Sequence, residues 1–99
     1  MFAHQAVRSG ADGFARATVL SSAADLGVAV DWTTTTLPYL NQWVFPTRGR
    51  WALGIEPATA PLFGPDREGP HAGAPVLAPG QSRFHEVRIT VGTRAAVAA

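Results

Sequence analysis

The sequence predicts an all-β fold, an antiparallel β-sandwich built from short strands. Ten glycines and eight prolines divide the 99 residues into short segments, and both residue types are costly inside a helix. Several of these segments are rich in β-branched and aromatic residues, which strands favour. The last of them alternates between apolar and polar residues, a pattern typical of a strand with one buried face.

The first half of the chain predicts two paired strands. Residues 14–21 and 26–32 are strand-like, and residues 22–25 between them predict a tight turn. A helix over residues 21–26 is the alternative, because two alanines favour it and a serine could cap it. Gly27 and the β-branched residues that follow limit how far such a helix could extend.

The middle of the chain predicts a β-hairpin. Residues 37–45 carry large apolar side chains on either side of the polar pair Asn41 and Gln42, and residues 51–56 alternate large and small side chains. The segment 46–49 has the composition of a turn, so a hairpin is the simplest connection between the two strands.

The remaining part of the chain predicts a loop and one further strand. Residues 57–80 contain most of the prolines and show no sustained periodicity, so we expect a long irregular loop. The last strand is expected over residues 82–91. Its buried face would consist of Val87, Ile89 and Val91, and its wet face of Glu86, Arg88 and Thr90.

A single domain is expected, because a chain of this length has no room for a second hydrophobic core. Residues 14–92 would form this β-sandwich domain. We expect residues 1–13 to be disordered and residues 93–99 to form a frayed tail.

Composition excludes several classes of function. The eight basic residues are all arginines scattered along a chain of net charge +1, which argues against a nucleic-acid partner. No cysteine is present, and the histidines His4, His71 and His85 match no ligand spacing, so we expect no metal site and no cofactor. The absence of a signal peptide and of a long apolar run favours a cytoplasmic protein with no membrane partner.

Three segments in a fixed order carry a resemblance to a known superfamily. They are LPYLNQWVF, RWALGIEPATAP and VLAPGQSRFHEVRITV. The chain resembles the C-terminal portion of the aldose 1-epimerase (galactose mutarotase)-like proteins, especially an uncharacterised branch with Gln-Trp followed by Gly-(Leu/Ile)-Glu-Pro. The resemblance covers residues 14–92. It implies that the sandwich is part of a galactose mutarotase-like supersandwich, with the sugar in a cleft across one sheet.

The same resemblance implies the chemistry of an aldose 1-epimerase, an isomerase. In that family a glutamate near the C-terminus acts as general base on the anomeric hydroxyl, and a histidine in the middle of the chain protonates the ring oxygen. Glu56 matches the position of the base. It follows the apolar residues Trp51, Leu53 and Ile55 with no intervening charge, and partial desolvation suits a carboxylate that must accept a proton. The simpler alternative is an exposed strand end without chemistry.

Sugar binding requires aromatic side chains that stack on apolar ring faces and polar side chains that hold hydroxyls. The residues expected to form this wall are Asn41, Gln42, Trp43, Arg48 and Trp51. The alternative for each tryptophan is a place in the core, since large aromatics at strand spacing are usually buried.

No histidine matches the family's acid. His85 alternates in phase with Val87 and is interpreted as a core or edge histidine. The expectation is therefore a truncated sugar-binding protein that has a base, lacks an acid and is weakly active or inactive. The alternative is a non-catalytic β-sandwich module that binds carbohydrate or assembles with copies of itself through exposed sheet edges. The expected partners are a small-molecule sugar, of unspecified identity, and further copies of the chain.

Overall fold

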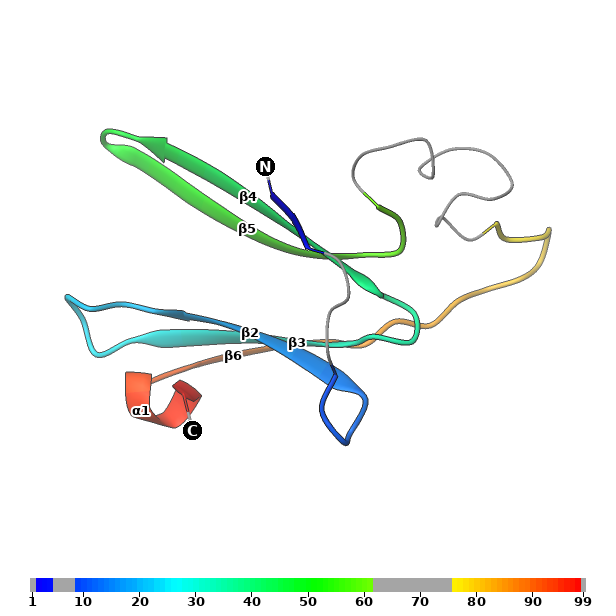
Figure 1. Cartoon of the computed structure of the whole chain (residues 1–99), viewed down its shortest axis with the longest axis horizontal. Helices are drawn as coiled ribbons and strands as arrows, with labels where there is room; N and C mark the ends of the chain where they lie inside the picture. The colour runs from blue at the N-terminus through cyan, green and yellow to red at the C-terminus, as the bar shows by residue number, and fades with distance from the viewer. Residues whose placement is uncertain (1, 5–8, 62–75, 99) are drawn as a thin grey trace.

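The protein is built almost entirely of strands. A computed structural model describes residues 2–4, 9–61 and 76–98 (Figure 1). Its elements are β1 (Phe2–His4), β2 (Phe14–Leu20), β3 (Gly27–Thr33), β4 (Tyr39–Thr47), β5 (Arg50–Ala58), β6 (Val87–Gly92) and α1 (Arg94–Ala98).

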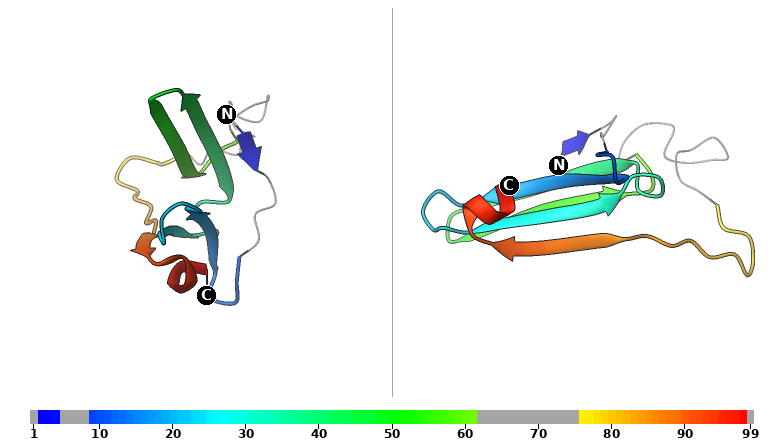
Figure 2. Two further views of the ribbon diagram at one scale, coloured as in Figure 1. Left: turned by 90° about the vertical axis from the view of Figure 1, so that its left-hand side faces the viewer. Right: turned by 90° about the horizontal axis from the view of Figure 1, so that it is seen from below.

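The described strands form two three-stranded sheets. One has the strand order β1-β4-β5 and the other β2-β3-β6, and every pair is antiparallel. The two sheets form separate layers when the molecule is turned (Figure 2). The predicted all-β class and its antiparallel pairing are therefore confirmed.

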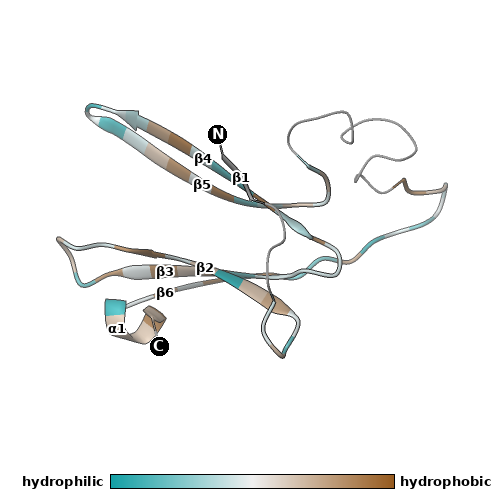
Figure 3. Cartoon of the chain, viewed as in Figure 1, coloured by the Kyte–Doolittle hydropathy of each residue, from teal (hydrophilic) through white to brown (hydrophobic). Residues whose placement is uncertain are grey.

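The two sheets converge at one end and spread apart at the other. The chain crosses from one sheet to the other between β3 and β4, and the free end of the β4–β5 hairpin lies away from the β2-β3-β6 sheet (Figure 1). The radius of gyration is 15.7 Å, whereas a compact domain of 100 residues has one of about 13 Å. Apolar residues occur along both sheets (Figure 3), and several large ones are exposed, among them Phe45, Trp51 and Ile89.

The β2–β3 hairpin agrees with the sequence prediction. Ser21 closes the turn, because its backbone N–H donates to Leu26 O at 2.9 Å and its Oγ accepts the Ala24 N–H at 3.1 Å. No helix forms over residues 21–26, so the alternative interpretation is wrong. The Ser21 hydroxyl accepts the Ala24 N–H and the Leu26 carbonyl accepts the Ser21 N–H, so these backbone donors are bonded within the turn and not in a helix.

The β4–β5 hairpin is also present, with a tighter turn than predicted. Thr47 pairs with Arg50, which leaves only Arg48 and Gly49 in the turn. Gly49 has a φ of 76°, a left-handed conformation that glycine adopts at no steric cost. The strand β5 continues through Pro57, because β5 pairs with β4 alone and its other edge needs no donor.

The hydrophobic core is small and lies where the sheets converge. It consists of Ala15, Trp32 and Leu37, with Ala17, Val30 and Leu40 packed against it. Trp32 is 1% exposed, and its Nε1 has no hydrogen-bond partner among the described residues.

The C-terminal segment is a short helix instead of the expected frayed tail. Val97 of α1 is 2% exposed, and it packs over Gly27 of β3, which offers no side chain of its own. Thr93 Oγ1 accepts the Ala96 N–H at 3.2 Å, and the Arg94 N–H donates to Asp25 Oδ1 at 3.1 Å. This capping and the contact with β3 hold the helix in place.

The N-terminal region also differs from the prediction. Residues 1–13 were expected to be disordered, but Phe2–His4 forms β1 and pairs with residues 40–42 of β4. The strand β1 forms by pairing with the edge of β4. The residues of positions 1–13 taken alone do not indicate this pairing.

The last strand is shorter and more exposed than predicted. Residues 82–86 have no regular structure, and β6 begins at Val87. The expected buried face is exposed, because Val87, Ile89 and Val91 retain 49%, 69% and 64% of their accessible surface. The strand β6 forms the edge of its sheet, and among the described residues nothing covers its apolar face.

Candidate functional site

Glu56 lies on β5 directly opposite Asn41 of β4. The register also pairs Trp43 with Gly54, two positions nearer the hairpin turn. Because side chains alternate between the faces of a sheet, Asn41, Trp43 and Glu56 share one face of the hairpin. The structure thus brings together three of the residues predicted for the site.

Gly54 makes room for the Glu56 carboxylate. A Cβ at position 54 would lie 2.8 Å from Glu56 Oε1 and 3.3 Å from Trp43 Cβ. The carboxylate therefore lies over the backbone of β5, beside Trp43, in space that any larger residue would fill. The side chain of Glu56 is exposed. The desolvation expected of a general base is not supplied by the residues that the structure describes.

Trp43 stacks on Phe45 on this same face. Their ring centroids are 5.7 Å apart at an interplanar angle of 22°, and the two residues are 39% and 43% exposed. We call Asn41, Trp43, Phe45 and Glu56 the hairpin face. Phe45 was not predicted as a site residue, although its spacing of two from Trp43 on a strand is a signal that places both rings on one side.

Gln42 and Trp51 lie on the opposite face of the same hairpin. Gln42 pairs with Ile55, one position out of phase with Asn41 and Glu56. Trp51 is 66% exposed and lines an apolar pocket of about 280 Å³ with Leu20, Leu26 and Val28. Arg48 lies in the turn at the end of the hairpin. The five residues of the predicted wall therefore do not form one surface.

A second pocket, of about 390 Å³, opens at the base of the hairpin. Its polar lining residues are Asn41, Thr59 and His85, and its apolar ones include Leu37 and Pro57. Asn41 is 8% exposed, and its side chain makes no hydrogen bond with any described residue. Among the described residues the only buried side-chain polar atom without a partner is Trp32 Nε1, so the Asn41 amide is in reach of solvent or of a ligand in the pocket.

His85 reaches this pocket because its segment is tied to the end of β3. The Thr33 N–H donates to Glu86 O at 3.2 Å, and the Glu86 N–H donates to Thr33 Oγ1 at 3.4 Å. His85 is exposed, so it is not a core histidine, and it lies two residues before the edge strand β6. His71 and the side chain of His4 lie outside the described part of the chain.

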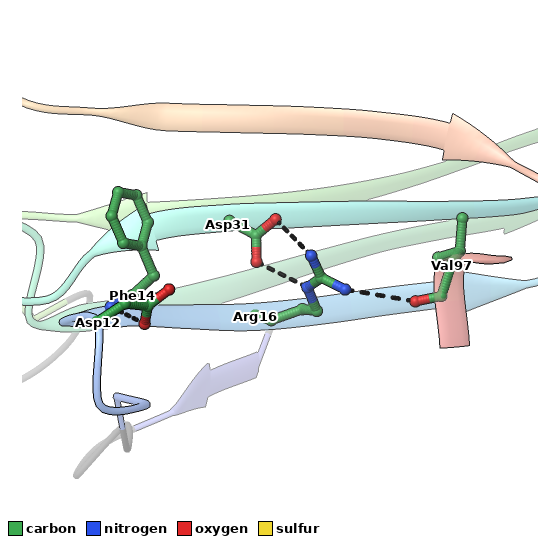
Figure 4. A network of polar contacts seen from close by, with 5 residues as sticks. All are labelled: Asp12, Phe14, Arg16, Asp31 and Val97. Carbon is green, nitrogen blue, oxygen red and sulfur yellow. Dashed lines mark hydrogen bonds and ion pairs between the residues drawn. The ribbon is translucent and has the colours of Figure 1, made fainter. Parts of the chain in front are cut away.

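A further polar network crosses the other sheet (Figure 4). Arg16 Nε lies 2.7 Å from Asp31 Oδ1 and Nη2 lies 3.1 Å from Oδ2, while Nη1 donates to Val97 O at 3.4 Å. The hydrogen bond from Arg16 lowers the pKa of Asp31, and the same bond raises the pKa of Arg16. The network joins β2, β3 and α1, which indicates a structural role.

The described residues hold no group of three or more metal-binding side chains. In the same part of the chain, no helix has the length and hydrophobicity needed to cross a membrane.

Residues 1–91 match the family described as a domain of unknown function, DUF4432. The chain belongs to the DUF4432 family. The DUF4432 match contains the hairpin face and the pocket at its base, and it ends inside β6, before α1. No curated protein and no solved structure matches the chain.

Proposed function

We propose that this DUF4432 protein binds carbohydrate on the hairpin face and belongs to the aldose 1-epimerase (galactose mutarotase)-like superfamily. In this proposal the two sheets are part of a mutarotase-like supersandwich. The observation that carries the proposal is the shared face of Glu56, Asn41 and Trp43, with Gly54 leaving space for the carboxylate. The face combines a carboxylate and an amide with two stacked aromatic rings.

This combination suits a sugar because a pyranose has apolar C–H faces and hydroxyls around its rim. An aromatic ring that is about 40% exposed offers a flat apolar surface at little conformational cost, as Trp43 and Phe45 do. The Glu56 carboxylate accepts hydrogen bonds from hydroxyls, and bonds to charged groups are about twice as strong as neutral ones.

In the proposed chemistry, Glu56 takes the proton of the anomeric hydroxyl while the bond between the anomeric carbon and the ring oxygen breaks. The ring oxygen gains a proton from a separate acid. Ring closure on either face of the resulting aldehyde then exchanges the anomers. General-base catalysis contributes about 10²- to 10⁴-fold to such a step. Because Glu56 is exposed, we expect catalysis by the chain to be weak.

Polarimetry tests the proposed reaction. Freshly dissolved α-D-galactose and α-D-glucose are followed with the chain, with Glu56→Gln and with Glu86→Gln, which removes another exposed carboxylate. We expect a small acceleration that Glu56→Gln abolishes and Glu86→Gln preserves. Acceleration that survives Glu56→Gln would contradict the role of Glu56.

Tryptophan fluorescence tests sugar binding without catalysis. Methyl α-D-galactoside and methyl α-D-glucoside are suitable probes, because a glycoside cannot open its ring. Trp43→Ala is expected to abolish the sugar-induced change, whereas Trp51→Ala, on the opposite face, preserves it. A wild-type chain that binds neither glycoside would refute the proposal.

The exposure of β6 favours a second candidate function, assembly with further copies of the chain. Within the described part of the chain, one edge of β6 has no neighbouring strand, and it lies next to three exposed apolar side chains. Light scattering over a range of concentrations tests this candidate, with Ile89→Lys as the disrupting variant. A mass equal to that of one chain at every concentration would exclude it.

A further inference from the structure

The pocket at the base of the hairpin carries a second inference, which rests on the proposed function. We propose that this pocket binds part of the same carbohydrate ligand, and that His85 and Asn41 are binding residues there. No role for His85 follows from the sequence, where its spacing matches no ligand pattern.

Four segments converge on the pocket, and the last of them is distant in the sequence from the others. The turn after β3 brings Leu37, the first half of β4 brings Asn41, and the segment after β5 brings Thr59. The segment before β6 adds His85. The pocket volume of about 390 Å³ falls within the range of small-molecule sites, roughly 300 to 1,000 Å³.

The side of the pocket that carries His85 is held by Thr33. The Thr33 backbone N–H and its Oγ1 both bond to the backbone of Glu86, and the Thr33 carbonyl accepts the Leu37 N–H at 3.1 Å. A single residue therefore fixes both Leu37 and the neighbour of His85. The imidazole is exposed and makes no hydrogen bond or ion pair with the described residues, so its nitrogens are available to a ligand.

Asn41 connects the pocket to the hairpin face. Asn41 is 8% exposed and lines the pocket, and its amide, which makes no hydrogen bond with the described residues, is accessible from the pocket. Across the ladder it faces Glu56. The backbones of Asn41 and Glu56 are therefore one strand spacing, about 5 Å, apart, and a ligand that contacts Asn41 lies next to the hairpin face.

The lining residues indicate the chemical class of the ligand. Among the described lining residues the polar groups are an amide, a hydroxyl and an imidazole, with no arginine or carboxylate, while Leu37, Pro57 and Pro61 are apolar. Such a set suits an uncharged ring with several hydroxyls and apolar C–H faces. It does not favour a phosphate or a carboxylate, which arginine would hold.

Calorimetric titration with methyl α-D-galactoside and methyl α-D-glucoside tests the inference. The variants are His85→Gln and Asn41→Ala, with Arg83→Gln as a matched control because Arg83 is exposed in the same segment and does not line the pocket. We expect His85→Gln and Asn41→Ala to raise the dissociation constant about five- to twentyfold, the loss of one or two hydrogen bonds. Arg83→Gln should change it by less than about twofold.

The outcomes separate this inference from the proposed function. If Trp43→Ala and Asn41→Ala weaken binding but His85→Gln does not, the sugar occupies the hairpin face alone and the inference is wrong. If the wild-type chain binds neither glycoside, both the inference and the proposed function are wrong. Because Asn41 is buried, thermal melting of Asn41→Ala checks that this variant is folded. His85 is exposed, so His85→Gln tests the inference independently of the fold.

Discussion

Replacing Gly54 by alanine is expected to disable the hairpin face without unfolding the protein. The new Cβ would lie 2.8 Å from Glu56 Oε1, and ordinary contacts begin at 3.4 Å, so the carboxylate must retreat by at least 0.6 Å (3.4 − 2.8). The nearest obstructing atom is the far end of a flexible side chain, which can rotate away, and Trp43 Cβ at 3.3 Å requires only a small shift. Stability should therefore change little, since alanine is also favoured over glycine in a strand by about 0.5 to 1 kcal/mol.

The cost of Gly54→Ala appears in sugar binding. A hydrogen bond to a charged group contributes about 1.5 to 3 kcal/mol, which corresponds to roughly ten- to a hundredfold in the dissociation constant. Fluorescence titration with a methyl glycoside measures this change. Gly92→Ala is the control, because a Cβ there meets its nearest atoms at 3.7 and 3.8 Å, far from the hairpin face. Unchanged affinity in Gly54→Ala, with an intact fold, would refute the placement of the Glu56 carboxylate in the binding site.

Three predictions concern the fold. Trp32→Phe should cost less than about 1.5 kcal/mol because no hydrogen bond of Nε1 is lost, whereas Trp32→Ala should cost about 3 to 5 kcal/mol. Equal losses in denaturant unfolding would contradict this expectation. Gly27→Ala should destabilise by about 1 to 3 kcal/mol and loosen α1, because the new Cβ would lie 2.9 Å from Val97 Cβ; an unchanged melting temperature contradicts this. Arg16 lowers the pKa of Asp31 in the folded state. The Arg16–Asp31 pair therefore contributes its full stability above the unfolded pKa of Asp31, near 3.8, and loses it as the pH falls below that value toward the lower pKa of the folded state. Melting temperatures between pH 5 and pH 2 should decline less steeply in Asp31→Asn than in the wild type.

Local patterns predicted the strands well because each strand signal lies within a few residues. The two hairpins follow from alternating apolar residues separated by turn residues, and no distant part of the chain is needed to place them. Glu56 was placed at the end of β5 by the same means. The bounds differed by about two residues: β4 runs to Thr47, β5 continues to Ala58, and the turn holds only Arg48 and Gly49.

The candidate site was predicted only in part, because three successive residues of a strand cannot share one face. Asn41, Gln42 and Trp43 were all expected to contact the sugar, but the period of two places Gln42 on the other side. Phe45 takes its place beside Trp43. Had the alternation been applied strictly, it would have separated these residues without a structure.

The exposure of β6 and the position of His85 depend on contacts between distant parts of the chain, which local sequence patterns do not show. The alternation in β6 correctly shows that Val87, Ile89 and Val91 share a face, but a pattern does not say whether another layer covers that face. His85 reaches the pocket only because Thr33, 52 positions earlier in the sequence, holds the adjacent backbone. Contacts over such separations depend on the path of the whole chain.

The double attachment of Glu86 to Thr33 also bears on the rate of ligand association. The conformational entropy of ordering this segment is lost during folding, so a ligand that enters the pocket does not have to order it again. Binding should then occur in a single kinetic phase whose observed rate rises linearly with glycoside concentration. Thr33→Val removes the hydroxyl that accepts the Glu86 N–H, and it should add a slower phase in which the freed segment closes on the ligand.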